Sequence, residues 1–195
     1  MVGLFSSLSL QAQQIGPGSF GAGSVTETYD NLGLPFDNST PLGIGGYTYT
    51  TDDGTLRYED DFGTFMGTTG GAVGSDSDLG FININFNGSV QQAGIQVGVD
   101  SAWTATVDFY DGVVLLGAVP LSGNGDDNGF AGWQNAAGIT SIQINDTAAN
   151  GKIILADNLI TDGSGGAVPD SSNTLLLLGF GISGLLFAGR KLGRA

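Results

Sequence analysis

The sequence predicts an all-β fold, an antiparallel β-sandwich, followed by a single C-terminal hydrophobic helix. Apolar and polar residues alternate between about Phe20 and Asp162, with the period of two that is typical of half-buried strands. Glycine makes up 35 of the 195 residues, and hydrophobic residues make up 41%, so the chain has both many turns and enough apolar residues for a core. An uncharged, mostly apolar run, residues 174–189, lies near the end of the chain.

The strand prediction is clearest where the alternation is strict. Ile82, Ile84 and Phe86 occupy one face of a predicted strand, and Asn83 and Asn85 occupy the other. The pattern recurs in residues 95–99, 103–109, 142–144 and 153–160. The turn residues between such runs are Asp52-Asp53-Gly54, Asn87-Gly88, Asp111-Gly112 and Gly123-Asn124-Gly125. About nine or ten short strands bounded in this way predict two antiparallel sheets packed face to face. The residues expected in the core are Trp103, Phe109, Phe81, Phe86 and Ile144.

The chain divides into four predicted segments. Residues 1–19 are either an N-terminal arm or an incomplete signal peptide, because a short apolar stretch precedes Ala12 but the first base is Arg57. If the segment is a signal peptide, the true start lies upstream of Met1. Residues 20–162 form the sandwich domain, residues 163–173 a Gly/Ser linker, and residues 174–195 the hydrophobic helix with a basic tail.

The net charge and the amino-acid composition exclude several kinds of catalysis and binding. The chain has no His and no Cys, which excludes His-dependent or Cys-dependent catalysis, disulfides and thiolate or imidazole zinc sites. Nineteen acids stand against five bases, and only Arg57 and Lys152 lie before residue 190. The body of the chain therefore repels phosphate backbones, so we expect no nucleic-acid binding. Cations and neutral molecules are the expected partners.

The apolar run near the C-terminus is predicted to be a transmembrane helix. Sixteen helical residues extend about 24 Å, slightly less than the hydrocarbon core of about 30 Å. The run is apolar on all faces and follows a flexible linker, which favours a membrane segment over a buried core helix. Arg190, Lys191 and Arg194 come directly after it. Because bases beside a span are retained in the cytoplasm, the acidic body is expected outside.

The end of the chain resembles a known class of sorting signal. Val168-Pro169-Asp170-Ser171-Ser172, then the apolar run, then Arg190-Lys191, resemble bacterial PEP-CTERM signals, in the variant with a Val-Pro-Asp-Ser-Gly box. Ser172 departs from the Gly of that box. The resemblance implies a Gram-negative bacterium that makes exopolysaccharide, and an exosortase-type membrane protease that recognises the box. It further implies transient anchoring in the inner membrane, followed by transfer to the cell surface or extracellular matrix.

The body resembles the jelly-roll, carbohydrate-binding-module-like domains common in proteins sorted in this way. The matching stretches are residues 25–33, 107–116, 129–133 with 139–144, and 155–160. The resemblance implies a structural Ca²⁺ held by Asp30 and Asp157, with Glu27 as a further ligand, because calcium prefers six to eight oxygen ligands. An alternative stays open, in which Asp30 begins an Asx turn and Asp157 ends a strand.

Three functional hypotheses follow from the sequence. The first is a non-enzymatic surface or matrix protein that remains among exopolysaccharide. The alternative is a carbohydrate-binding, lectin-like module, in which exposed aromatic residues stack on sugar rings; the candidates are Trp133, Tyr47 and Tyr49. A third, less favoured hypothesis is a glycoside hydrolase that uses carboxylates such as Glu59 and Asp61.

Overall fold

A computed structural model describes residues 12–61, 70–75, 79–98, 102–124, 127–147 and 154–163. Within these ranges the chain forms twelve strands and one short 3₁₀ helix, η1 (Pro17–Ser19). The strands are β1 (Gln13–Gln14), β2 (Val25–Glu27), β3 (Asp37–Ser39), β4 (Leu42–Ile44), β5 (Tyr47–Thr51), β6 (Thr55–Glu59), β7 (Ala72–Ser75), β8 (Phe81–Gly98), β9 (Trp103–Asp111), β10 (Val114–Gly123), β11 (Asn128–Asp146) and β12 (Leu155–Thr161).

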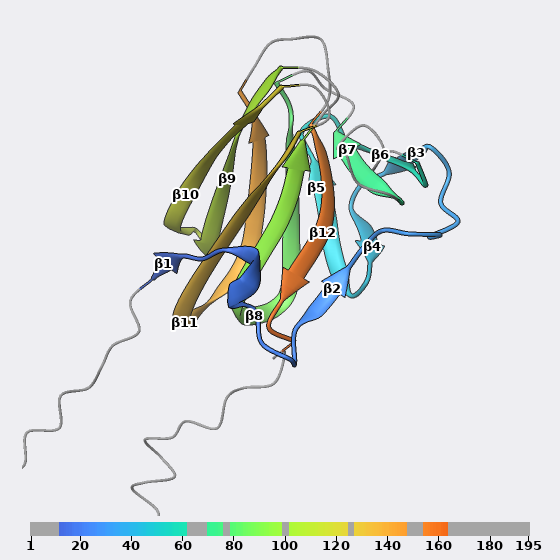
Figure 1. The fold of residues 1–195 in the computed structure, drawn as a ribbon. Helices are drawn as coiled ribbons and strands as arrows, with labels where there is room; N and C mark the ends of the chain where they lie inside the picture. The colour runs from blue at the N-terminus through green and yellow to red at the C-terminus, as the bar shows by residue number, and fades with distance from the viewer. Residues whose placement is uncertain are drawn as a thin grey trace, which may run out of the picture. The chain divides into compact units, whose positions relative to one another are not determined.

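Most of the strands form two layers that face each other, and β3 and β6 extend from β7 at one side (Figure 1). The first layer contains β10, β9, the second half of β11, the first half of β8, β5 and β4, in that order. The second layer contains β1, the first half of β11, the second half of β8 and β12, with β2 and β7 paired to β12. Every pairing among the described strands is antiparallel, so the prediction of an all-β antiparallel fold is confirmed.

One long ribbon joins the two layers. β8 and β11 are 18 and 19 residues long, and they pair with each other in both layers, from Asn145↔Phe81 at one end to Asn128↔Gly98 at the other. The pairing is interrupted between Gln134 and Ile139 and again between Ile139 and Ser141, and here the ribbon bends from one layer into the other. Because the two strands bend together, β8 and β11 stay paired with each other in both layers, while their outer neighbours change from β5 and β9 to β12 and β1.

The bend corrects one prediction from the sequence. Asn87-Gly88 does not end a strand in a tight hairpin; both residues lie within β8. Asn87 has a φ of 50° and Gly138 on the paired strand has a φ of 112°, which is the left-handed region that Asn and Gly tolerate best. These residues bend the ribbon locally. β8 changes direction at this bend together with its paired strand β11, and not at a hairpin turn that ends the strand. Asp111-Gly112, in contrast, forms the predicted turn between β9 and β10.

The core lies between the two layers. Trp103, Phe109, Phe86 and Ile144 are buried, as predicted. Phe81 is only half-buried, because Ile82, Ile84 and Phe86 take the inward positions of β8 and leave Phe81 on the other face. The buried apolar residues of β8, β9, β11 and β12 form one continuous cluster, so a single core supports the domain.

Two contacts show how the layers meet across the core. Phe109 of β9 stacks on Trp133 of β11, with ring centroids 5.9 Å apart and an interplanar angle of 22°. The Tyr47 hydroxyl of β5 lies 3.1 Å from Thr161 Oγ1 of β12. Each pair joins a strand of one layer to a strand of the other, so the layers are held in register by packing and by hydrogen bonding.

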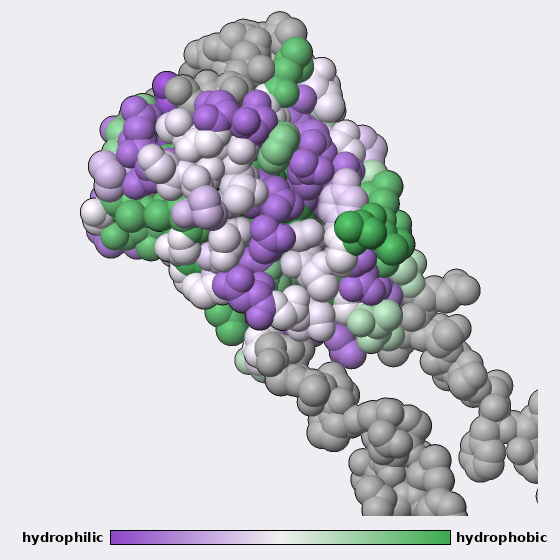
Figure 2. Space-filling view, turned by 180° about the vertical axis from the view of Figure 1, so that it is seen from behind, coloured by the Kyte–Doolittle hydropathy of each residue, from purple (hydrophilic) through white to green (hydrophobic). Residues whose placement is uncertain are grey.

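The outward face of the first layer is polar. Thr50, Asn83, Gln143 and Asp108 are successive neighbours across β5, β8, β11 and β9, and all four are half-exposed. Viewed from behind, most of the surface is hydrophilic or neutral (Figure 2). β10 ends this layer; it contains a register shift between Leu115 and Gly117 and a proline, Pro120, in its middle.

Several predicted segments lie outside the described residues. They include most of the N-terminal arm (residues 1–11), the box Val168–Ser172, the apolar run 174–189 and the bases Arg190, Lys191 and Arg194. Among the residues that the structure does describe, no helix has both the length and the apolar character needed to cross a membrane.

Close packing around Trp133 leads to a prediction about Gly117. A Cβ atom at Gly117 would overlap the indole ring of Trp133, so Gly117→Ala should destabilise the domain by about 1–3 kcal/mol through overpacking. Gly43→Ala, also within a strand, is the matched control because its Cβ would come no closer than 4.0 Å to a neighbouring atom. Urea unfolding midpoints measure both changes, and equal midpoints for the two variants would contradict the packing described for Trp133.

Candidate functional site

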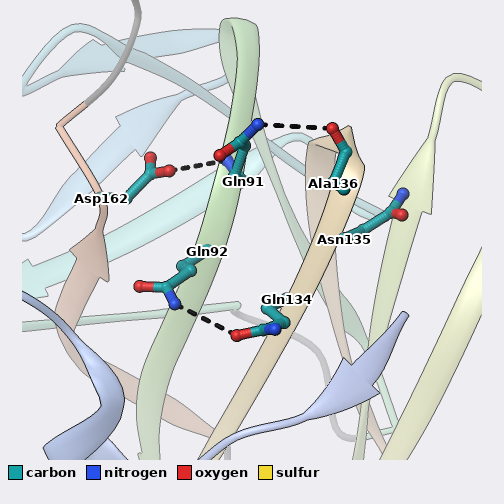
Figure 3. Close-up of a pocket in the computed structure, with 6 residues that line it drawn as sticks. All are labelled: Gln91, Gln92, Gln134, Asn135, Ala136 and Asp162. Carbon is teal, nitrogen blue, oxygen red and sulfur yellow. Dashed lines mark hydrogen bonds between the residues drawn. The ribbon is translucent and has the colours of Figure 1, made fainter. Parts of the chain in front are cut away.

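A cavity of about 290 Å³ opens where the β8–β11 ribbon bends. It is formed by residues from β8, from β11 and from the end of β12 (Figure 3). The described lining residues are Gln91, Gln92, Gln134, Asn135, Ala136 and Asp162. We call this cavity the amide pocket, because four of these six side chains are carboxamides.

Cross-strand pairing positions the two central glutamines. Gln92 of β8 lies directly opposite Gln134 of β11, and Gln92 Nε2 donates a hydrogen bond of 3.2 Å to Gln134 Oε1 (Figure 3). Side chains of directly opposite residues in an antiparallel pair project from the same face of the sheet. The two amides therefore stand side by side at the wall of the pocket.

Asp162 ties the end of β12 to the bend. Its Oδ2 accepts a hydrogen bond of 3.0 Å from the backbone N–H of Gln91, and its own backbone N–H donates to Gln92 O at 3.2 Å. Gln91 Nε2 donates across the pocket to Ala136 O at 3.4 Å. These bonds link β8, β11 and β12 around one opening.

Asn135 supports the bend from within. It is buried, at 8% exposure, and its Nδ2 donates a hydrogen bond of 2.8 Å to Gly138 O. Its Oδ1 accepts from the backbone N–H of Ala137 at 3.4 Å. The amide of Asn135 thus stabilises the interrupted segment between Gln134 and Ile139, whereas the three glutamines are half-exposed and accessible.

The lining determines the chemistry that the pocket supports. Neutral amides offer both donors and acceptors, and one carboxylate offers acceptors only. No base and no aromatic ring stands among the described lining residues. The arrangement suits a neutral ligand rich in hydroxyl groups and disfavours an anion.

The sequence prediction of exposed aromatic residues is wrong for the two tyrosines. Tyr49 is fully buried and Tyr47 is 9% exposed, because both alternate with outward threonines on β5 and point into the core. Trp133 lies within β11, and its ring packs on Phe109 rather than standing exposed. None of the three rings stands as an open stacking platform.

A buried tyrosine pair is a feature that the sequence analysis missed. The Tyr29 hydroxyl lies 2.9 Å from the Tyr49 hydroxyl, and both side chains are fully buried. Burial raises the pKa of Tyr29 well above its usual value, and the neighbouring Tyr49 hydroxyl and then the charges of Glu27 and Asp157 raise it further. Burial likewise raises the pKa of Tyr49. Both phenols therefore stay protonated and act as a polar link inside the core.

The three predicted calcium ligands each have hydrogen-bond partners in the structure. Glu27 Oε1 accepts a hydrogen bond of 3.1 Å from the backbone N–H of Tyr29, and Asp30 Oδ1 accepts one of 2.8 Å from Gly71 N–H. The carboxylate of Asp157, which is 1% exposed, accepts hydrogen bonds from the backbone and the side chain of Asn158. Among the described residues, no group of three or more acidic side chains is arranged to hold a metal ion. Calcium binding stays a prediction.

The acidic residues proposed for hydrolysis lie away from the amide pocket. Glu59 and Asp61 are exposed and line a second cavity of about 480 Å³ beside Leu34 and Phe36. Between them, Asp60 accepts hydrogen bonds from the Tyr58 hydroxyl and from Asn31 N–H, so it stabilises the loop. This cavity is more acidic than the amide pocket and shares no residue with it.

A comparison with protein families identifies the C-terminal segment. Residues 167–192 match the VPDSG-CTERM motif. The C-terminal segment of the chain carries a VPDSG-CTERM motif. This match confirms the resemblance found in Val168–Ser172 and the following run, and it covers the C-terminal segment rather than the β domain.

Solved structures similar to the β domain share little sequence with it. A family 29 carbohydrate-binding module from Piromyces equi is 14% identical, with 71% of this chain and 89% of the module covered and a TM-score of 0.41. A cleaved adhesin domain of Lys-gingipain from Porphyromonas gingivalis is 10% identical, with 71% and 96% covered and a TM-score of 0.47. No curated protein matches the chain significantly.

A calcium titration checks the prediction for Glu27, Asp30 and Asp157. The prediction expects a higher thermal midpoint in millimolar CaCl₂ than in EDTA, since an ion at 100 times its Kd stabilises a fold by about 2.7 kcal/mol. Asp157→Asn should remove this shift, and MgCl₂ is the control ion. A wild-type midpoint that is the same in CaCl₂ and in EDTA would contradict the calcium prediction.

Proposed function

We propose that this chain is an exported, non-enzymatic protein of the cell surface or extracellular matrix, sorted and processed by an exosortase-type membrane protease. The observation that supports this proposal most directly is the match of residues 167–192 to the VPDSG-CTERM motif. The motif contains the box Val168–Ser172, and the bases Arg190 and Lys191 follow the apolar run. With this order, the protease would meet the box on the outer side of the membrane, while the bases keep the end of the chain on the cytoplasmic side.

The proposed sequence of events uses each part of the tail. The apolar run 174–189 holds the chain transiently in the inner membrane, and Arg190, Lys191 and Arg194 stay in the cytoplasm. The protease then cuts near the box and releases the β domain. The acidic domain, with only Arg57 and Lys152 as bases, is repelled by anionic lipid surfaces, which favours its release into the matrix.

A non-enzymatic role agrees with the chemistry of the chain. The sequence has neither His nor Cys, so catalysis would depend on carboxylates. Asp60, in the densest acidic cluster, is hydrogen-bonded within the fold, and Glu59 and Asp61 are exposed. A structural or adhesive role requires none of these groups to react.

The intact mass of the protein recovered from the native envelope tests sorting. The wild-type chain should lack the segment that follows the cut, whereas Pro169→Ala in the box should leave a full-length chain in the membrane fraction. Pro120→Ala, the same substitution in the exposed middle of β10, is the matched control and should be processed normally. A wild-type mass that still includes Leu175–Ala195 would mean a retained anchor and would contradict processing.

Carbohydrate binding is the second candidate function, and the amide pocket is the observation that favours it. Sugar hydroxyls both donate and accept hydrogen bonds, and carboxamides can satisfy both roles at once. The half-exposed amides of Gln91, Gln92 and Gln134 provide such groups around one opening. An exopolysaccharide of the producing cell is the expected partner of a protein that stays in the matrix.

A glycan array probed with the full chain, with and without calcium, tests this second function. We expect binding to uncharged polysaccharides, because amide side chains complement hydroxyl groups. Polyanionic glycans should bind least, since the domain is strongly acidic. A lack of binding to every glycan, including the host's own exopolysaccharide, would remove the lectin hypothesis and leave the sorting proposal intact.

A further inference from the structure

We propose that the amide pocket binds a single neutral sugar residue, with the Gln92–Gln134 pair recognising two neighbouring hydroxyl groups and Asp162 excluding acidic sugars. The inference deepens the second candidate function, carbohydrate binding, and rests on it. It assigns the ligand class and the recognising atoms to the pocket at the bend of the β8–β11 ribbon.

The glutamine pair is arranged to meet two hydroxyl groups. The bond from Gln92 Nε2 to Gln134 Oε1 leaves Gln92 Oε1 as an acceptor and Gln134 Nε2 as a donor, and no other hydrogen bond of either atom exists within the described residues. Of two neighbouring hydroxyls on a sugar ring, one can donate to Gln92 Oε1 while the other accepts from Gln134 Nε2. The existing amide–amide bond holds both groups in place before the ligand arrives, which lowers the entropic cost of binding.

The backbone behind the pair is also held in place. Asp162 forms two hydrogen bonds with the backbone of β8. Its carboxylate accepts from Gln91 N–H, and its own N–H donates to Gln92 O. On the opposite wall, Asn135 stabilises the interrupted segment of β11 by its bond to Gly138 O. The two walls of the pocket are thus braced independently of any ligand, as a preformed binding site requires.

Charge selects against acidic sugars. Asp162 is the one charged side chain among the described lining residues, and nineteen acids against five bases make the chain strongly negative. A uronic acid or a phosphorylated sugar would bring a second negative charge beside Asp162, and no base stands among the described lining residues. A neutral sugar meets no such repulsion and gains a carboxylate acceptor for its hydroxyl groups.

The size of the pocket suits about one sugar ring. Its volume of about 290 Å³ lies just below the range of about 300–1,000 Å³ that is usual for small-molecule sites. The described lining offers no aromatic platform along which a longer chain would stack. The pocket therefore fits a terminal or branching residue of a polysaccharide better than an internal stretch of a linear chain.

The test titrates the full chain with methyl glycosides of glucose, galactose, mannose and N-acetylglucosamine, and with glucuronic acid as the anionic comparison. We expect at least one neutral glycoside to bind. Glucuronic acid should bind with a Kd at least about tenfold higher, a difference of about 1.4 kcal/mol in binding free energy. Gln134→Glu replaces the donor by a charged acceptor and should weaken the neutral glycoside by about tenfold or more. Gln134→Met removes the donor without adding charge and should weaken binding as well.

Matched controls separate a local effect from a change in the fold. Gln143→Glu makes the same substitution on the outward face of the first layer, where Gln143 pairs with Asp108, and should leave the affinity unchanged. Asp162→Asn keeps an oxygen that can accept from Gln91 N–H and should reduce the discrimination against glucuronic acid. The thermal midpoint of each variant is measured beside its affinity.

The outcomes distinguish this inference from the function on which it rests. A glycan that binds equally well to wild type, Gln134→Glu and Gln134→Met would show that the amide pocket is not the binding site, although the domain would still bind carbohydrate. Equal affinity for glucose and glucuronic acid glycosides in wild type would overturn the role of Asp162. An absence of any binding on the array and in the titration would remove both the function and the site.

Discussion

The structure depends on one constraint, the shared bend of β8 and β11. These strands are paired in both layers, so the layers cannot separate without breaking the ribbon that joins them. The bend needs residues that tolerate left-handed backbone on both strands, and Asn87 and Gly138 supply them. Packing of Phe109 on Trp133 then closes the space between the layers. The core, the amide pocket and the position of β12 all follow from this folded ribbon.

Much of the fold could be predicted from the sequence because strand alternation is a local signal. Ile82, Ile84 and Phe86 show the period of two and are buried as expected. The same rule, applied to Tyr47-Thr48-Tyr49-Thr50, predicts inward tyrosines; the expectation of exposed rings came from a likeness to sugar-binding proteins, and the local pattern was the better guide. The bend was missed because Asn-Gly has the same local preference in a hairpin turn as in a bent strand, and only the partner strand distinguishes them.

The candidate site is less accessible to sequence analysis than the fold. Gln92, Gln134 and Asp162 are far apart in the chain and come together only through the register of three strands. A single sequence gives no measure of that register, and glutamine on a strand is ordinarily a solvent-facing residue. The C-terminal segment is the opposite case, because its box, apolar run and bases follow one another in the sequence. The tail was therefore identified from sequence alone, whereas the pocket needed coordinates.

The last strand of the first layer has a consequence for how copies of this domain meet one another. An unpaired strand edge invites another copy to add its own strand, and repeated addition produces fibrils. β10 interrupts this route twice, by the register shift near Leu115 and by Pro120, which has no N–H to offer. Both features of β10 therefore disfavour edge-to-edge pairing between copies of this domain.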